Sequence, residues 1–306
     1  MNRRTASHVS AWLGRIGMIA VLVSLGACDS LRTSGNAAKP NEPQPPVTAD
    51  WIGAANQALI QGRPGEALDQ YQRLLVQDPK NVEAKLGSGE ALLALNDPEK
   101  AREAFSSVVS DAALGARALQ GRGLSELAQN HIDEAAVDLN DAVAADPKLW
   151  RAWNGLGLIH DLKHEWAPAR AAYEKALPNA PKSGIIHNNI GFSFLVQKNY
   201  AAAAEEFRAA LREVPSLETA QNNLRLALAF QGRYREALAE VPKEERAAQL
   251  NNVGYVALLR KDYSAAESYF SQAMEASPSY YDIAAQNLSR LKALEGQASS
   301  TKPKSD

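Results

Sequence analysis

The sequence predicts an all-α fold in which pairs of helices repeat along the chain as a right-handed solenoid and a last helix covers its end. Two observations predict it. Alanine, a strong helix former that lets helices approach closely, supplies 55 of the 306 residues. Small and large apolar residues also recur with a period of 34 residues, a length that fits one helix pair. Aromatic residues make up only 7% of the chain, which argues against a β-sandwich or a doubly wound sheet.

Four kinds of residue at fixed offsets define the repeat. A small residue recurs at Ala67, Ala101, Ala135, Ala169, Ala203, Ala237 and Ala266. A large apolar residue follows four positions later, at Tyr71, Phe105, Leu139, Tyr173, Phe207, Val241 and Phe270. A glycine comes twelve positions before the alanine, at Gly89, Gly123, Gly157, Gly191 and Gly254, and a proline twelve after it, at Pro79, Pro147, Pro181, Pro215 and Pro278. This pattern resembles the tetratricopeptide repeat, whose units are antiparallel helix pairs.

The pattern predicts the elements in order. In each unit the glycine of the first helix and the alanine of the second mark where the two backbones come closest, and the proline ends the second helix. The expected units are 48–81, 82–115, 116–149, 150–183, 184–217, 218–246 and 247–280. A capping helix, Tyr281–Leu294, then closes the solenoid domain at 295, because the open apolar end of a solenoid needs a cover. Its predicted outer face carries Asp282, Gln286, Ser289, Arg290 and Lys292.

Three units depart from the pattern. The second has Ala113 where the proline is expected. The third has Arg122 and Glu126 at positions that are normally packed, and their spacing of four residues on one helix suggests that they pair with each other. The sixth has Arg225 in place of the glycine and is five residues shorter, so its second helix should be clipped near Pro242.

The first 27 residues are predicted to be a signal peptide and not part of the fold. A basic lead is followed by a short apolar core, Ile16–Leu25, which fits a secretory signal better than a membrane span. The core ends in Leu25-Gly26-Ala27-Cys28, which resembles the bacterial lipoprotein signal. That resemblance implies lipidation of Cys28, the only cysteine of the chain. The alternative is an ordinary signal cut near Ala27, with Cys28 incidental.

Two segments outside the repeats are predicted to lack a packed core. Residues 28–47 contain four prolines and are typical of a flexible tether behind the lipidated cysteine. Residues 296–306 are polar and are expected to be a disordered tail. The predicted anchor places the protein in the cell envelope, facing the periplasm. Asp29 is associated with retention in the inner membrane of enteric bacteria, so the choice of membrane stays open.

The chemistry-bearing residues are sparse. The net charge of −2 gives no electrostatic case for nucleic-acid binding, and one cysteine excludes an intrachain disulfide framework. His160 and His164 have a spacing that can hold a metal, but His160 falls at a packing position and no third ligand is evident. No nucleophile elbow, phosphate loop or dinucleotide fingerprint occurs. We therefore expect neither an enzyme nor a cofactor or metal site.

Asparagines on the first helices of the late units are the predicted binding residues. They occupy the same two positions in successive units, at Asn188 and Asn189, Asn222 and Asn223, and Asn251 and Asn252, with Asn154 at the first position of unit four. In tetratricopeptide proteins these positions generally face the groove. A carboxamide can donate and accept, so a ladder of them could clasp an extended peptide, with apolar pockets at Phe192, Leu226 and Tyr255. The alternative is that these asparagines cap their helices.

The last units also resemble a more specific family. Asn188–Leu195, Asn222–Ala229, Gln231–Tyr234, Leu250–Tyr255 and Ala276–Tyr281, followed by Ala284–Leu288, look like the TadD family of tetratricopeptide lipoproteins of the Tad (Flp) pilus assembly system. The resemblance implies an accessory role in building the pilus, with the outer-membrane secretin or another pilus component as partner. The alternative is a general periplasmic scaffold or chaperone for other envelope or secretion machinery.

Overall fold

The computed structural model describes residues 50–180, 182–276 and 281–300 of the chain. Every regular element in these ranges is a helix, which confirms the predicted all-α fold. The predicted signal peptide, Cys28 and the tether lie outside the described residues.

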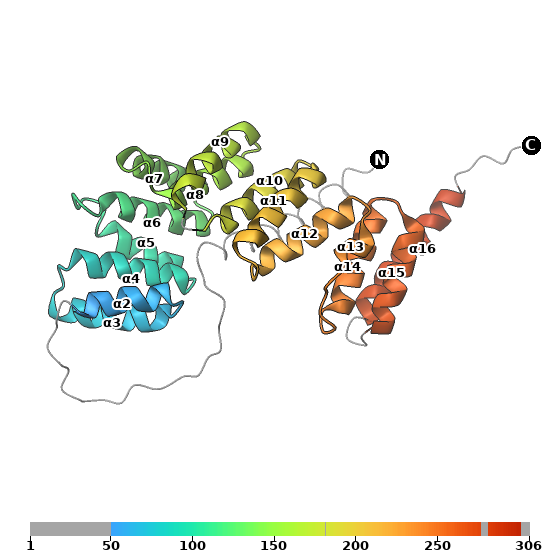
Figure 1. Ribbon diagram of the computed structural model, residues 1–306, viewed down its shortest axis with the longest axis horizontal. Coiled ribbons are helices and arrows are strands. Elements are labelled where there is room, and N and C mark those ends of the chain that lie inside the picture. Colours follow the sequence, from blue (N-terminus) through green and yellow to red (C-terminus); the bar gives the residue numbers. More distant parts are fainter. Residues whose placement is uncertain (1–49, 181, 277–280, 301–306) are drawn as a thin grey trace, which may run out of the picture. The chain divides into compact units, whose positions relative to one another are not determined.

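Helices alternate as first and second members of successive pairs (Figure 1). The first helices are α2 (Asp50–Ile60), α4 (Val82–Ala94), α6 (Gly115–Ala128), α8 (Trp150–Leu162), α10 (Gly184–Val196), α12 (Glu218–Phe230) and α14 (Arg246–Leu259). The second helices are α3 (Pro64–Gln77), α5 (Pro98–Ser106), α7 (Ile132–Ala145), α9 (Trp166–Ala176), α11 (Tyr200–Glu213), α13 (Tyr234–Ala237) and α15 (Tyr263–Ala276). A short 3₁₀ turn, η1 (Leu177–Asn179), follows α9, and α16 (Tyr281–Ser300) ends the helical array.

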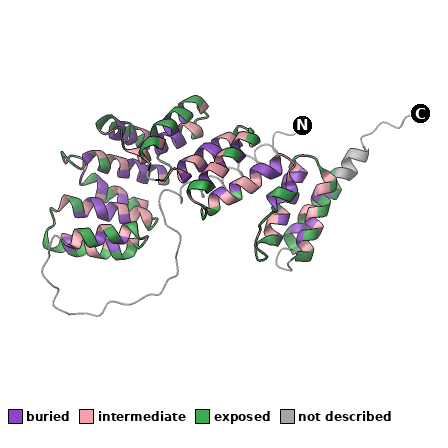
Figure 2. Cartoon of the chain, in the orientation of Figure 1, coloured by how far each residue is buried: buried purple, intermediate pink, exposed green. Residues whose placement is uncertain are grey.

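The helices fall into two compact units that divide within α10, after Ile186. In the first unit, each second helix packs against the first helix of its own pair, and α3, α5 and α7 also pack against the first helix of the next pair. In the second unit, α11 packs on α12, α14 on α15, and α15 on α16. Each unit thus buries its apolar residues between neighbouring helices (Figure 2).

The repeat residues form the core. All seven alanines that anchor the pattern are fully buried, and the large residue four positions later is buried in six of the seven pairs. In five of the seven pairs, a glycine of the first helix makes room for that large side chain. At Gly191, for example, an added Cβ would stand 2.7 Å from the Phe207 ring, closer than real Cβ contacts. The close approach at Gly191 is therefore helix backbone against aromatic ring. At Gly123 an added Cβ would also stand 3.2 Å from the carbonyl oxygen of Ala135, so there the two backbones come close as predicted.

A left-handed residue ends the first helix of every pair. It stands five positions before the anchoring alanine, and its φ lies between 60° and 81° at Gly62, Asn96, Asn130, His164, Lys198, Gly232 and Lys261. The next residue then donates its N–H to a carbonyl five positions back, as Asn199 does to Phe194 at 2.9 Å. This is the Schellman ending, which satisfies the last carbonyls of the helix. The motif fixes the sharp reversal into the second helix.

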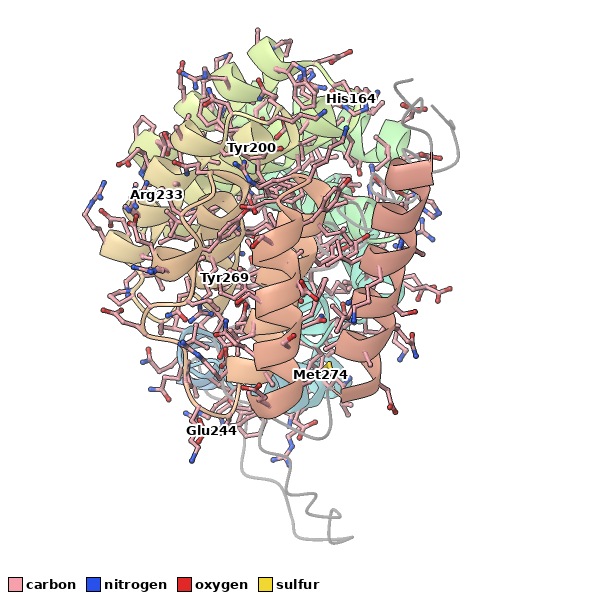
Figure 3. The ribbon with its side chains drawn as sticks, turned by 90° about the vertical axis from the view of Figure 1, so that its right-hand side faces the viewer. His164, Tyr200, Arg233, Glu244, Tyr269 and Met274 are labelled. Atoms are coloured by element: carbon pink, nitrogen blue, oxygen red, sulfur yellow. The ribbon has the colours of Figure 1, made fainter. Side chains whose placement is uncertain are left out.

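The sixth pair is shortened as the sequence predicts, but its second helix ends at Ala237, five residues before the predicted break at Pro242. Its second helix, α13, has four residues, and α14 begins at Arg246 after a connection that contains Pro242 and Glu244 (Figure 3). The first helices α12 and α14 also pack against each other, as α2 does with α4, α4 with α6 and α6 with α8. Tyr234 anchors α13 by an edge-on contact with Tyr269 of α15, at 5.6 Å between ring centroids.

The capping helix is longer than expected. α16 begins at Tyr281 but continues to Ser300, so the prediction of a disordered tail from residue 296 is wrong for residues 296–300. Alanine and glutamine continue the helix there, and Gly296 alone does not end it. The five polar residues predicted for its outer face, Asp282, Gln286, Ser289, Arg290 and Lys292, are all exposed.

Candidate protein-binding surface

The predicted asparagine ladder separates into buried and exposed members. Asn154, Asn188 and Asn189 are each 1% exposed, and Asn223 is also buried. Asn251 is half-buried, whereas Asn222 and Asn252 are exposed. The prediction that all seven line an open groove is therefore wrong for the four buried residues. Their side chains lie in the helix packing and not at the surface.

Hydrogen bonds between neighbouring helices explain the burial in the second unit. The Asn223 amide on α12 donates to Asn188 Oδ1 on α10 at 3.0 Å, and the Asn287 amide on α16 donates to Asn251 Oδ1 on α14 at 2.9 Å. A buried carboxamide needs such a partner, because an unpaired one would cost about 1–3 kcal/mol. Each of these two bonds links the first helix of one pair to the helix that follows that pair, α10 to α12 and α14 to α16. Neither Asn188 nor Asn223 starts its helix, so helix capping does not account for them.

The exposed members form a polar strip over α12 and α14, made of Asn222, Arg225, Gln249 and Asn252. Asn222 Oδ1 accepts from Arg225 Nη1 at 3.0 Å and from Gln249 Nε2 at 3.4 Å. Asn252 lies three residues after Gln249 and therefore on the same face of α14. The strip holds carboxamide groups at the surface on two neighbouring first helices.

The shortened sixth pair accounts for Arg225 within the strip. In five other pairs the equivalent position is a glycine covered by a large side chain of the second helix. Four-residue α13 supplies no such cover, and Val241, at the position of that large residue, lies beyond its end. The Arg225 side chain, 15% exposed, occupies this region and reaches Glu245 in an ion pair at 3.8 Å.

Two of the three predicted apolar residues lie next to the strip. Leu226 lies one turn after Asn222 on α12, and Tyr255 lies one turn after Asn252 on α14. Both are half-buried and pack against the core of the second unit, as does Phe192 on α10. The strip therefore combines hydrogen-bonding groups with half-buried apolar side chains.

The two histidines at and just after the end of α8 make separate contacts. His160 Nδ1 lies 2.6 Å from Glu165 Oε2. His164 is the left-handed residue of its turn, and its ring lies 5.1 Å from that of Trp166 (Figure 3). Within the described ranges, no group of three His, Cys, Asp or Glu side chains could hold a metal ion. In the same ranges, no helix combines the length and hydropathy needed to cross a membrane.

The third pair contradicts one predicted contact. Arg122 pairs with Asp138 of α7 and not with Glu126, its neighbour on α6. Both oxygens of Asp138 accept from the guanidinium, a two-bond geometry that Glu126 does not make. Sequence reasoning missed Asp138, because the residue comes from a different helix than its partner.

Comparison with solved structures supports the fold. At a TM-score of 0.56 and 17% identity, the chain resembles a chain of the APC/C hetero-tetramer Cut9–Hcn1, covering 80% of this chain and 49% of that one. It also resembles TTC0263, a thermophilic TPR protein in Thermus thermophilus, with a TM-score of 0.51 and 20% identity over 62% of this chain and 97% of that one. A tetratricopeptide repeat protein from Parabacteroides merdae matches at a TM-score of 0.50 and 15% identity over 79% and 98%.

Sequence comparison identifies the repeats directly. No curated protein sequence shows a significant match to this chain. The family model for the tetratricopeptide repeat matches residues 52–116, 121–184 and 163–218, which together are more than half of the chain. With its helix pairs, buried repeat alanines and similar folds, the chain belongs to the tetratricopeptide-repeat family.

Proposed function

We propose that the protein is a membrane-anchored interaction scaffold of the cell envelope and an accessory factor in Tad (Flp) pilus assembly. Tetratricopeptide repeats imply protein partners in general. The observation that carries the binding role is the polar strip, because it exposes Asn222 and Asn252 beside half-buried Leu226 and Tyr255. The proposed partner is the outer-membrane secretin or another pilus component, which is the kind of partner that the resemblance to the TadD family implies.

The pilus assignment rests on the resemblance of residues 184–294 to the TadD family. The localisation rests on Cys28 at the end of the predicted signal, which would hold the protein at a membrane and facing the periplasm. The family resemblance favours the outer membrane, whereas Asp29 is the residue that favours the inner one.

Two double variants separate binding from stability. Asn222→Ala with Asn252→Ala removes the exposed carboxamides. The gain in helix propensity from alanine offsets the loss of the surface hydrogen bonds that Asn222 accepts from Arg225 and Gln249, so the melting temperature should stay close to that of wild type. Binding should weaken, since each hydrogen bond lost contributes about 0.5–1.5 kcal/mol, or roughly 5- to 150-fold for the pair. The matched control is Asn188→Ala with Asn223→Ala, which breaks the buried bond and should lower the melting temperature.

The measurement is a thermal melt together with binding of the purified secretin by the full chain. Loss of secretin binding in the exposed double variant, with its stability intact, supports the proposal. Secretin binding equal to wild type would remove the strip from the binding site. If wild type binds no pilus component but retains an unrelated envelope protein, the general periplasmic scaffold replaces the pilus role.

A further inference from the structure

A cluster of ionisable side chains lies inside the third pair, at positions that other pairs fill differently. Arg122 and Glu126 belong to α6, and Asp138 belongs to α7. The residues at the same positions one repeat later are Leu156, His160 and Ala172. Because burying a charge is costly unless it is paired, three charged residues here need a specific arrangement.

Asp138 and Arg122 satisfy each other. Asp138 is buried, and its two oxygens accept from the Arg122 guanidinium, with Nη2 at 2.6 Å from Oδ1. The charge of this carboxylate is therefore compensated, and Arg122 has its fork directed at Asp138.

Glu126 lacks such a partner. Its side chain is 8% exposed, and its Oε2 atom is buried without a hydrogen bond. Across the helix contact, Nε of Arg102 on α5 is also buried without a hydrogen bond. An unsatisfied acceptor and an unsatisfied cationic donor thus lie on two helices that pack against each other.

The charges around Glu126 come from several helices. Arg122 is on its own helix, Asp138 and Glu134 are on α7, and Arg102 is on α5. The other helices against α6 make different contacts: Glu90 of α4 pairs with Arg117 at 2.8 Å, and the Ala152 N–H of α8 bonds to Gln120. Burial, followed by repulsion from Asp138, raises the pKa of Glu126 to about 7, against the lowering effect of the two arginines.

We propose that Glu126 is a protonation switch for the packing of α5 on α6. The neutral carboxyl fits the arrangement in the structure, in which Oε2 accepts no hydrogen bond from a cation. On losing its proton the carboxylate draws Arg102 into an ion pair across the α5–α6 contact, and the two helices repack. The device responds to pH near neutrality, and it is separate from the polar strip.

The sign of the pH effect follows from linkage. The folded chain holds the Glu126 proton more tightly than the unfolded chain, in which the carboxyl titrates near its ordinary value of 4.5. Stability is therefore highest, with respect to this group, below pH 4.5 and is lost as the pH rises through about 7. Above that range the contribution is constant.

The test compares the full-length wild type with Glu126→Gln between about pH 5 and 8.5, a range that brackets the raised pKa. Across this range the melting temperature of the wild type should fall by several degrees more than that of Glu126→Gln. At the alkaline end Glu126→Gln should be the more stable protein. Arg102→Gln removes the proposed partner of the carboxylate and with it a charge that lowers the pKa of Glu126, so in this variant the fall should extend to a higher pH and be deeper than in wild type. Glu134→Gln is the matched control: Glu134 is exposed and has the smallest effect on the pKa of Glu126, so the variant should shift the wild-type profile only slightly, toward lower pH.

Two measurements on the wild type keep the proposal falsifiable without any variant. The Glu126 carboxyl should titrate near pH 7 by carbon NMR, and the amide protection factors of α5 and α6 should change across the same range. Titration of Glu126 near the ordinary value of a glutamate would overturn the switch. A carboxyl that titrates near neutrality while α5 and α6 keep constant protection would overturn the repacking.

Discussion

The residues with positive φ show how single side chains set the repeat. Seven turns place a left-handed residue at the same position, yet glycine occurs at only two of them. This backbone conformation destabilises a residue with a side chain by about 1–2 kcal/mol, whereas glycine adopts it freely. Asparagine tolerates it better than lysine does, so the lysine turns carry the larger cost.

Lys198→Gly should therefore stabilise the protein. Lys198 has φ of 62° and is exposed, so the substitution relieves the backbone without removing buried contacts. We expect a gain of about 1 kcal/mol, which corresponds to a rise of roughly 2–4 °C in melting temperature. Lys198→Ala keeps a Cβ and should give no such rise. Equal melting temperatures for the two variants would show that the turn is not strained.

The asparagines show where residue-level prediction stops. The sequence identifies them by repeat position, but exposure depends on the helices that cover that position. Asn189 and Asn223 share a position with Asn252, yet the first two are buried and the third is exposed. The bonds from Asn223 to Asn188 and from Asn287 to Asn251 join residues 35 and 36 positions apart. A strict period of 34 does not predict these contacts.

At the scale of the element, the periodic positions are predicted well because a helix pair leaves few alternatives. An alanine on the second helix faces the first helix, and a bulky residue one turn later fills the remaining space. The seven alanines and the shortened α13 follow from the sequence for this reason. The length of α16 did not follow, since helix ends depend on weak local preferences.

Ala203→Leu should destabilise α11 on its neighbours. Ala203 is fully buried, and overpacking such a site typically costs about 1–3 kcal/mol. Ala201, two residues earlier on the same helix, is exposed, so Ala201→Leu is the matched control and should leave the melt unchanged. Similar melts for both leucine variants would place the buried face of α11 elsewhere.

Arg225→Gly restores the residue typical of the repeat and should nevertheless destabilise the protein. The glycine makes room for a large side chain in other pairs, but α13 provides none here. Loss of the packed aliphatic part of the arginine side chain lowers stability. Glycine inside α12 lowers it further, by about 1 kcal/mol relative to alanine, because glycine is a poor helix former. A melt of Arg225→Ala separates the two contributions. A more stable glycine variant would contradict the role assigned to Arg225.

At the scale of the whole molecule, the predicted signal peptide, the lipidated cysteine and the tether belong to residues that the structure does not describe. The tetratricopeptide fold is shown for the helical part, whereas anchoring depends on Cys28 and the segment before it. From Cys28 to the start of α2 there are 22 residue steps, which span at most about 80 Å when extended. A lipid on Cys28 would therefore keep the start of α2 within that distance of a membrane.

Cys28→Ser should release the protein from the membrane fraction or leave its signal uncleaved. The thiol is the group that would take the lipid, and each buried CH₂ of an acyl chain contributes about 0.8 kcal/mol to membrane binding, so loss of the chains removes the anchor. The measurement is fractionation of cells with metabolic lipid labelling. The sharpest control combines Cys28→Ser with Ser30→Cys, which moves the thiol two residues away from Leu25-Gly26-Ala27. Because the signal is defined by the residues before the cysteine, the moved thiol should stay unlabelled. Normal labelling and retention of Cys28→Ser would mean that the apolar segment holds the protein at the membrane by itself.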